Sequence, residues 1–483
     1  MASVDTQSVR NEVKRIKAEF DALKNNARVS PEVSMLVSSL LTILELMMAI
    51  FLERTTKKNA KNSSIPPSQT QPDETSPSKT GSNNKGKNEI HQTAENTRSV
   101  ESITIATVST CSCCGEDLSS TDIIEHERRT KIDILFEKTI EHVDGEVKQC
   151  PTCQSITKAD FPSDLHGPLQ YGAGVKAFVI NLVIAQMVSL SRVQKMVNAM
   201  MNTLLSEATI LKFVLRLHQA LQGWEDQARE QILKASVIQV DETGFRVNKK
   251  NYWIHVYASG DLTLKLLHRK RGLVAIEAFN IIPRYGGVII HDCWASYLSY
   301  DHCGHGLCGS HLLRELTFIV ESNHYAWAKN MKGLLQETCY KVAQHKNKKL
   351  TTVEFKNLRK RYRNILTRGE KEMPVIPPKE KGKRGKMAKS DAHNLWERFK
   401  KYEEAILLFS KETDVPFTNN RAERDLRMAK VKKKVSGCFR TETYAHAYCR
   451  ISSYLQTMAS KGYNPLLAIQ IALAGNIPSV GGE

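Results

Sequence analysis

Val237-Ile238-Gln239-Val240 opens the stretch of sequence that decides the fold, which runs from residue 235 to residue 310. Runs of β-branched and aromatic residues such as this one predict β-strands. Three of them come in succession, at 237–240, 252–257 and 262–267. A helix at 273–279, an unbroken apolar strand at 288–290, a short helix, a strand from 306 and a helix from 311 follow. This order predicts a mixed sheet that is flanked by helices.

Two aspartates follow predicted strands in this stretch, whose order of elements is that of a ribonuclease-H-like fold. Asp241 ends the first strand, and Asp292 comes directly after 288–290. If those strands are neighbours, both carboxylates lie at one edge of the sheet. Mg²⁺ prefers oxygen ligands, and two such ions about 3.5–4 Å apart promote phosphodiester hydrolysis and strand transfer. The pair therefore predicts a divalent metal site, although an aspartate at a strand end is also a common turn residue.

A third metal ligand is expected from a helix that crosses the same edge. Asn419-Asn420 favours the start of a helix whose first turn contains Glu423. Neighbouring arginines would bring positive charge to DNA phosphates: Arg421, Arg424 and Arg427. Three other carboxylates compete with Glu423 for the role: Glu315, Asp425 and Glu242.

The balance of charge favours a polyanionic partner. The chain has 69 Lys and Arg against 51 Asp and Glu, which gives a formal net charge of +18 and a pI near 9.3. Nucleic acid is the first candidate. A helical insertion at about 325–410 contains a basic loop that is either solvated or placed along phosphates. Its basic residues are Lys379, Lys381, Lys383, Arg384, Lys386 and Lys389.

Two Cys-x-x-Cys pairs, Cys111 with Cys114 and Cys150 with Cys153, predict a Zn²⁺ module. Four thiolates fill a tetrahedral site, so a structural role is favoured over a catalytic one. Cys113 is a competing ligand. The chain has eleven cysteines, an odd number, and its sequence has no signal-peptide pattern. Both features favour a reducing compartment, the cytoplasm.

The N-terminal region predicts a self-association arm. A coiled-coil seam is indicated by alternating steps of four and three between Val9, Val13, Ile16, Phe20 and Leu23. An apolar run at 33–52 follows, but Glu45 and several Ser and Thr residues interrupt it, which argues against a membrane span. A helix packed on its own chain is the competing interpretation of the seam.

Helical periodicity between residues 171 and 224 predicts a domain of the helix-turn-helix type that binds DNA. Ser191 with Gln194 has the spacing of a capping box, and Ser206 is a second predicted cap. A plain helical bundle would show the same pattern.

The chain divides into six predicted segments. Residues 55–99 are expected to be a disordered linker, because they have almost no large apolar side chain. The other segments are a self-association arm (1–54), a zinc module (105–160), a helical DNA-binding domain (165–230), a catalytic domain with its insertion (231–440) and a helical tail (441–483).

Several motifs, in order along the chain, resemble insertion-sequence transposases of the sixty-six family. The central ones are Val240-Asp241-Glu242-Thr243, His291-Asp292-Cys293-Trp294 with Tyr297, Cys308 with His311-Leu312-Leu313-Arg314-Glu315-Leu316, and Asn419-Asn420-Arg421-Ala422-Glu423-Arg424. The cysteine pairs, Asn62-Ser63-Ser64-Ile65-Pro66-Pro67-Ser68 and Ser436-Gly437-Cys438-Phe439-Arg440 with Gly462-Tyr463-Asn464-Pro465 are also similar. The resemblance extends from about residue 55 to the C-terminus.

The resemblance implies a multidomain α+β transposase of the Asp-Asp-Glu class, with Asp241, Asp292 and Glu423 as catalytic metal ligands. It implies that Mg²⁺ or Mn²⁺ supports DNA cleavage and strand transfer, and that the protein acts at the bacterial nucleoid. Expected partners are the terminal inverted repeats, target DNA, further copies of the chain and accessory proteins of the same element, with no membrane. The alternatives are a catalytically inactive DNA-binding repressor, or a nuclease or resolvase of the same fold.

Overall fold

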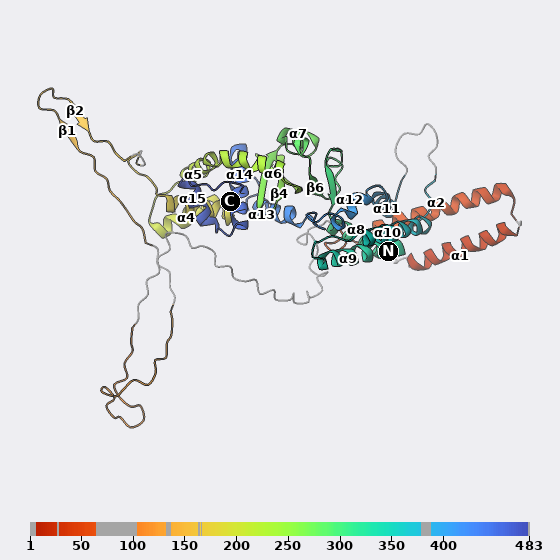
Figure 1. Cartoon of the computed structure of the whole chain (residues 1–483), viewed down its shortest axis with the longest axis horizontal. Helices are drawn as coiled ribbons and strands as arrows, with labels where there is room; N and C mark the ends of the chain where they lie inside the picture. Colours follow the sequence, from red (N-terminus) through yellow and green to blue (C-terminus); the bar gives the residue numbers. More distant parts are fainter. Residues whose placement is uncertain are drawn as a thin grey trace. The chain divides into compact units, whose positions relative to one another are not determined.

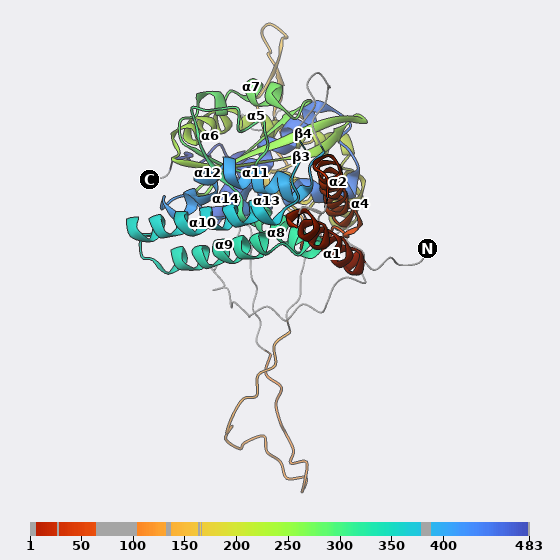
Figure 2. The ribbon, with the colours of Figure 1, turned by 90° about the vertical axis from the view of Figure 1, so that its right-hand side faces the viewer.

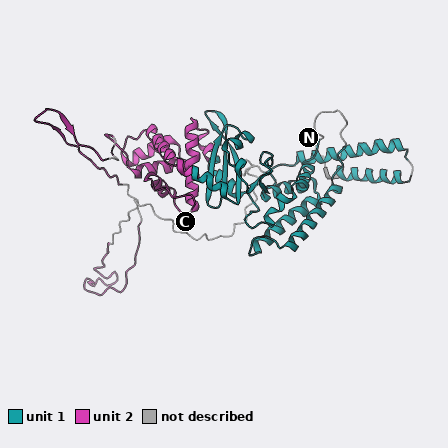
Figure 3. Cartoon of the chain, turned by 45° about the horizontal axis from the view of Figure 1, so that its top comes forward, with its two compact units in different colours: residues 1–87, 226–430 teal, residues 88–225, 431–483 magenta. Residues whose placement is uncertain are grey.

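The computed structural model describes residues 6–26, 29–63, 104–131, 137–162, 165, 167–377 and 388–481 (Figure 1). Most of the predicted linker at 55–99 and the basic loop at 378–387 therefore lie outside the described residues. Contacts divide the chain into two units, and each is described by itself (Figure 3). The first unit holds residues 1–87 and 226–430, and the second holds residues 88–225 and 431–483.

A five-stranded mixed sheet lies at the centre of the first unit, in the order β5-β4-β3-β6-β7. Its strands are β3 (Val237–Val247), β4 (Lys250–Ser259), β5 (Leu262–His268), β6 (Val288–His291) and β7 (Gly304–Leu307). The strands β3, β4 and β5 pair antiparallel, whereas β6 runs parallel to β3 and β7 runs parallel to β6. The five strands predicted from the sequence are confirmed.

The short helix expected between β6 and β7 is wrong, because residues 292–303 form turns. Tertiary hydrogen bonds fix this connection: the Tyr297 hydroxyl donates to Glu242 at 2.9 Å, and the Tyr300 hydroxyl donates to Glu277 at 2.5 Å. Both tyrosines are buried. The connection is therefore held as a series of turns, in which the Tyr297 N–H donates to the Trp294 carbonyl at 3.1 Å and the Tyr300 N–H to the Tyr297 carbonyl at 3.2 Å.

Helices surround the sheet and continue into an insertion with a core of its own. The helices α6 (Gln222–Lys234), α7 (Leu273–Phe279) and α8 (Gly309–Asn323) are joined to strands of the sheet. The region predicted as a helical insertion is helical, with α9 (Ala326–Gln344), α10 (Thr352–Glu372), α11 (Asp391–Lys401) and α12 (Glu403–Leu407), and α8, α9 and α10 lie side by side (Figure 2). Their core joins Trp327, Tyr362 and Phe399, and each such side chain contributes about 1.5–3 kcal/mol by burial.

The N-terminal arm is a hairpin of α1 (Thr6–Asn25) and α2 (Pro31–Thr55). Ser30 caps α2 by accepting the Val33 N–H at 3.4 Å, and Pro31 at the first helical position has no N–H to satisfy. The residues of the predicted seam on α1 fall into a buried group and an exposed group. Its buried members are Val13 and Phe20, whereas Val9, Ile16 and Leu23 are 42–43% exposed.

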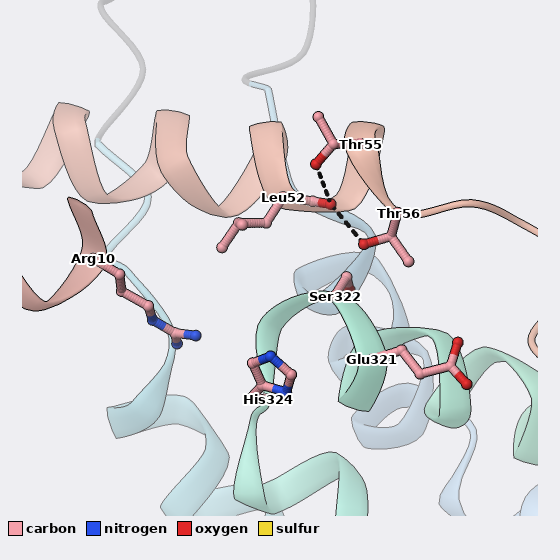
Figure 4. A pocket seen from close by; sticks show the side chains of 7 residues that line it. All are labelled: Arg10, Leu52, Thr55, Thr56, Glu321, Ser322 and His324. Carbon is pink, nitrogen blue, oxygen red and sulfur yellow. Dashed lines mark hydrogen bonds between the residues drawn. The ribbon is translucent and has the colours of Figure 1, made fainter. Parts of the chain in front are cut away.

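The hairpin is anchored to the insertion at the end of α2. Glu53 is buried, and its carboxylate accepts the N–H groups of Asp391 and Ala392 at the start of α11, at 2.5 and 3.0 Å. The Asn323 amide at the end of α8 donates to the same carboxylate at 2.8 Å. A pocket beside this contact is lined by residues of α1, the end of α2 and the end of α8: Arg10, Leu52, Thr55, Thr56, Glu321, Ser322 and His324 (Figure 4).

By length and composition, α2 is the one helix among the described residues that is apolar enough to cross a membrane. Its outer face is exposed and apolar, with Leu36, Leu40, Ile43 and Met47 at steps of four, three and four. Its opposite face, with Leu41, Leu46, Ala49 and Glu53, is buried. A buried carboxylate that caps another helix favours a surface helix of the folded unit over a span.

The second unit is a helical bundle that joins distant parts of the chain. It contains α3 (Ala173–Ile180), a π-helical turn (Asn181–Ala185), α4 (Leu190–Met201), α5 (Glu207–Ala220), α14 (Glu442–Ser460) and α15 (Pro465–Leu473). Arg450 of α14 binds Glu225 at 2.7 Å and the His218 carbonyl at 2.9 Å in the buried interior. The helices after residue 441 thus complete the bundle that α3 begins.

The turn between α4 and α5 matches one of the two predicted caps. Ser206 accepts the Thr209 N–H at 3.1 Å and caps α5, as predicted. The capping box at Ser191 is wrong: the N-cap of α4 is Ser189, two residues before the predicted cap, and Ser191 lies inside the helix; the backbone at Met187, just before this cap, has a positive φ of 59°. DNA binding by this helix pair stays a prediction.

Candidate active site

The register of three parallel strands places Asp241, Asp292 and Cys308 in one row. Gln239 of β3 is paired with Ile290 of β6, so two more residues on each strand bring Asp241 level with Asp292. The Cys308 N–H donates to the His291 carbonyl at 2.9 Å, which continues the β6–β7 ladder and places Cys308 next in the row. Neighbouring strands lie about 4.8 Å apart, so the row gathers its side chains at the carboxyl edge of β6.

The two aspartates follow the sequence prediction, with one difference. Asp292 comes directly after β6, as expected. Asp241 lies within β3 and not at its end, because antiparallel pairing with β4 continues to Val247. What ends near Asp241 is the pairing with β6, whose last residue pair is Gln239 with Ile290. The side chain of Asp241 therefore lies beside the position where β6 gives way to Asp292.

The electrostatics of this edge favour a cation. Burial, the neighbouring Glu242 and the more distant Asp292 raise the pKa of Asp241 to about 7. The Glu242 N–H donates to Asp241 at 2.8 Å, and Lys430 of the helix α13 (Asn420–Ser436) also opposes the rise. Closely spaced carboxylates whose negative charge is only partly offset by a hydrogen bond and a lysine are ligands that suit a hard divalent ion.

The segment before α13 crosses the carboxyl edge of the sheet and delivers Glu423 to it. The Asn419 side chain donates to the Val240 carbonyl at 2.7 Å, and its backbone N–H donates to Cys308 Sγ at 3.2 Å. Two residues earlier, the Phe417 carbonyl accepts the Gly309 N–H at 2.8 Å. A Cβ on Gly309 would lie 2.2 Å from the Phe417 ring, so this crossing needs glycine there.

Glu423 meets two residues that the sequence did not assign to the site. Glu423 Oε1 lies 3.5 Å from His311 Nδ1. Cys308, His311 and Glu423 each offer a ligand atom, and these atoms lie within 4.8 Å of one another. Asp292 also interacts electrostatically with the His311 ring. Burial lowers the pKa of His311, so the ring favours its neutral form.

The three rival carboxylates are held by other partners. Glu315 binds Arg398 of α11 at 2.5 Å, and Asp425 binds Arg421 at 2.9 Å. Glu242 is 1% exposed and takes a 2.6 Å contact from Arg271. Glu423 therefore stays the predicted third acidic residue, although Glu242 also interacts electrostatically with Asp292.

Aromatic rings flank the site on the side of Glu242. The Arg271 guanidinium lies over the Trp294 ring at 4.4 Å and over the Trp253 ring at 4.9 Å. Stacking of this kind contributes about 0.5–2 kcal/mol per ring and holds the guanidinium flat against Glu242. Sequence analysis missed Arg271, since no local motif links it to residue 242.

The residues predicted to bind DNA differ in their surroundings. Arg424 and Arg427 are exposed on α13. Arg421 braces α13 against the β4–β5 turn, where it donates to the Gly260 carbonyl at 3.0 Å as well as binding Asp425. Three further residues of the prediction lie outside the described residues: Lys383, Arg384 and Lys386.

The two cysteine pairs form matching knuckles in the second unit. The Gly115 N–H donates to the Cys111 carbonyl at 3.0 Å, and the Gln154 N–H donates to the Cys150 carbonyl at 2.9 Å. Both turns close with a positive φ, at Gly115 (79°) and Gln154 (60°). Hydrogen bonds with Ser155 lower the pKa of Cys153 to about 7. Among the described residues the four thiols do not converge into one ligand group, so shared zinc stays a prediction.

Fold and site together define a mixed α/β protein with acidic side chains at the carboxyl edge of β3 and β6. The family model described as Transposase IS66 family matches residues 168–447. This match covers more than half of the chain, which therefore belongs to the IS66 family of insertion-sequence transposases. A search of curated proteins found no match to the chain.

Proposed function

We propose that the chain cleaves DNA at the ends of its insertion sequence and joins them to target DNA through Asp241, Asp292 and Glu423. The observation that supports this most is the shared level of Asp241 and Asp292 on neighbouring strands, in a chain of this transposase family. The order of elements in the first unit further supports a ribonuclease-H-like core.

The proposed reaction has two steps of the same kind. A water oxygen forms a bond to phosphorus while the P–O3′ bond at the element's end breaks, which frees a 3′-hydroxyl. That hydroxyl then forms a bond to a target phosphorus while the target's P–O3′ bond breaks. Divalent ions such as Mg²⁺ would stabilise the attacking and leaving oxygens in both steps.

The side chains of the chain supply the frame for this chemistry. The donor set fits a hard ion, since Asp241 and Asp292 offer oxygens at one level and Glu423 has a buried oxygen without a hydrogen-bond partner. Asn419 holds the start of α13 over Val240 and so positions Glu423. Arg424 and Arg427 are exposed on the same helix, where they would bind DNA phosphates.

Other segments would bind the ends of the element and assemble the complex. We assign DNA binding to the α4–α5 pair and the basic residues Lys383, Arg384 and Lys386, and self-association to the N-terminal hairpin. Accessory proteins of the same element are further partners in this proposal, and the complex would operate at the nucleoid in the cytoplasm.

Labelled element ends with Mg²⁺ and target DNA test the proposal. Asp241→Asn, Asp292→Asn and Glu423→Gln should each lower cleavage by more than about 100-fold, because even outer residues of metal sites cost 10–100-fold. Binding of the ends in a gel-shift assay should persist. The matched control is Glu315→Gln, which changes a rival carboxylate held by Arg398 and should still cleave.

Each other outcome excludes part of the proposal. Full cleavage by Glu423→Gln, with loss in Glu315→Gln, would move the third acidic role to α8. Cut ends that are never joined would indicate a nuclease or resolvase, and bound ends that are never cut would indicate a repressor.

A further inference from the structure

We infer that Cys308, His311 and Glu423 form a second kind of metal site, one that takes Zn²⁺ and thereby withholds Glu423 from the DNA reaction. The inference shares Glu423 with the proposed function but does not depend on it for metal binding. The three residues come from three elements that meet at the carboxyl edge of the sheet: the end of β7, the first turn of α8 and the first turn of α13.

The distances fit a small tetrahedral ion. Ligand atoms of the three side chains lie within 4.8 Å of one another, and His311 Nδ1 is 3.5 Å from Glu423 Oε1. Bonds of 2.0–2.3 Å around tetrahedral Zn²⁺ hold pairs of ligand atoms about 3.3–3.6 Å apart. The nitrogen and oxygen are already at this separation, so only a small shift would bring all three atoms onto one ion.

Two buried atoms face each other at this place without a hydrogen bond. His311 Nδ1 and Glu423 Oε1 are both buried, and neither has a hydrogen-bond partner. A buried polar atom without a partner costs about 1–3 kcal/mol. A cation between the two atoms would satisfy both at once, which supplies a reason for an arrangement that is otherwise unfavourable.

The donor set selects a borderline ion over Mg²⁺. Thiolate and imidazole ligands suit Zn²⁺, whereas carboxylate and water suit Mg²⁺. The sulfur is held in place, since Cys308 Sγ accepts the Asn419 N–H at 3.2 Å. Three protein ligands also leave a fourth position open, as in zinc sites that exchange their outer ligand.

Zn²⁺ bound at this site would inhibit DNA cleavage directly, through Glu423. Glu423 lies close to Cys308 and His311, within 4.8 Å between ligand atoms. An ion bound to the sulfur and nitrogen would draw Glu423 towards α8 and away from the aspartates. Micromolar Zn²⁺ should therefore slow cleavage in excess Mg²⁺.

Titration with Co²⁺ measures metal binding at this site without any DNA reaction. The full chain, with Cys111, Cys113, Cys114, Cys150 and Cys153 changed to serine, is titrated with Co²⁺. A thiolate-to-cobalt charge-transfer band and visible bands of tetrahedral Co²⁺ are expected, and Zn²⁺ should remove both. The matched control is Cys293→Ser in the same background, because Cys293 follows Asp292 but lies outside the ligand group.

Cys308→Ser should abolish the charge-transfer band, while the Cys293→Ser control keeps it. His311→Gln leaves the sulfur in place and should weaken Co²⁺ binding at least about tenfold, which covers the case of a misfolded Cys308→Ser. A band that survives in a folded Cys308→Ser, or no band in the parent, would overturn the inference. Cleavage without Zn²⁺ is measured separately, so its failure would count against the proposed function alone.

Discussion

Asn419 fixes more of the site than its place before a helix suggests. It is 1% exposed, and its amide binds the Val240 carbonyl one residue before Asp241. Asn419→Ala should lower the stability of the chain by about 1–3 kcal/mol, because it removes a buried hydrogen bond. Cleavage should fall about 10–100-fold as Glu423 loses its position.

Thermal unfolding and cleavage of labelled ends check this prediction against Asn420→Ala. Asn420 is the exposed neighbour, so its change tests the loss of an asparagine without the loss of the contact. Wild-type cleavage by a folded Asn419→Ala would show that α13 holds Glu423 by other means.

The sequence predicts the position of a single site residue better than it predicts which distant residues come into contact. Asp292 was found because an unbroken apolar strand, Val288-Ile289-Ile290, stops just before it. The meeting of Cys308 and His311 with Glu423 depends on the register of β7 and on the crossing at Asn419, 111 residues after Cys308. No local pattern contains that information, so the sequence alone does not predict that these three residues lie together.

Among the elements, α2 depends on one carboxylate for its anchorage. Glu53 accepts two N–H groups at the start of α11, where the helix dipole also favours a negative charge. Glu53→Ala should therefore lower stability by about 1–3 kcal/mol, since it leaves these donors buried without a partner.

The exposed pair of Lys17 and Glu45 provides the comparison for Glu53. Glu45→Ala removes a carboxylate from the same helix, but surface ion pairs contribute only about 0–1 kcal/mol. Urea unfolding of both variants checks the prediction. Equal losses would mean that the hairpin is held mainly by its apolar contacts.

The outer stripe of α2, defined as Leu36, Leu40, Ile43 and Met47, predicts the place of self-association. Its steps of four, three and four are those of a coiled-coil seam, and two DNA ends cut together need two copies of the chain. Leu40→Lys with Met47→Lys should weaken the oligomer, because charge would enter an apolar contact.

Light scattering of the purified chain measures this effect, with Ala18→Lys on the exposed surface of α1 as the control. An unchanged oligomer in the double variant would place assembly elsewhere. Binding of the parent to lipid vesicles, lost in the double variant, would instead make the stripe a membrane contact. On α1, Ile16 is exposed, so a charged residue there would test the predicted seam in the same assay. Phe20 is buried, so a charged residue there would measure folding instead.

Helix boundaries show where sequence patterns are weakest. Ser206 was predicted correctly because its hydroxyl has only the α5 start to cap. Ser191 has the spacing of a capping box to Gln194, but α4 begins at Leu190 and contains Ser191, after a positive φ at Met187. A positive φ at a non-glycine residue cannot be recognised from composition, so the sequence pattern predicted the wrong cap.

For the whole molecule, the cysteine knuckles predict metal content. Two Cys-x-x-Cys turns with the same backbone hydrogen bonds are formed at Cys111 and Cys150, and four thiolates hold Zn²⁺ more firmly than a three-ligand site with a carboxylate. The chain purified with a mild chelator should therefore contain about one zinc. Cys111→Ser with Cys150→Ser should release it, whereas Cys303→Ser, at a buried thiol that bonds to the Tyr285 carbonyl, should not. Elemental analysis decides the matter, and zinc-free parent protein would show that the knuckles close without metal.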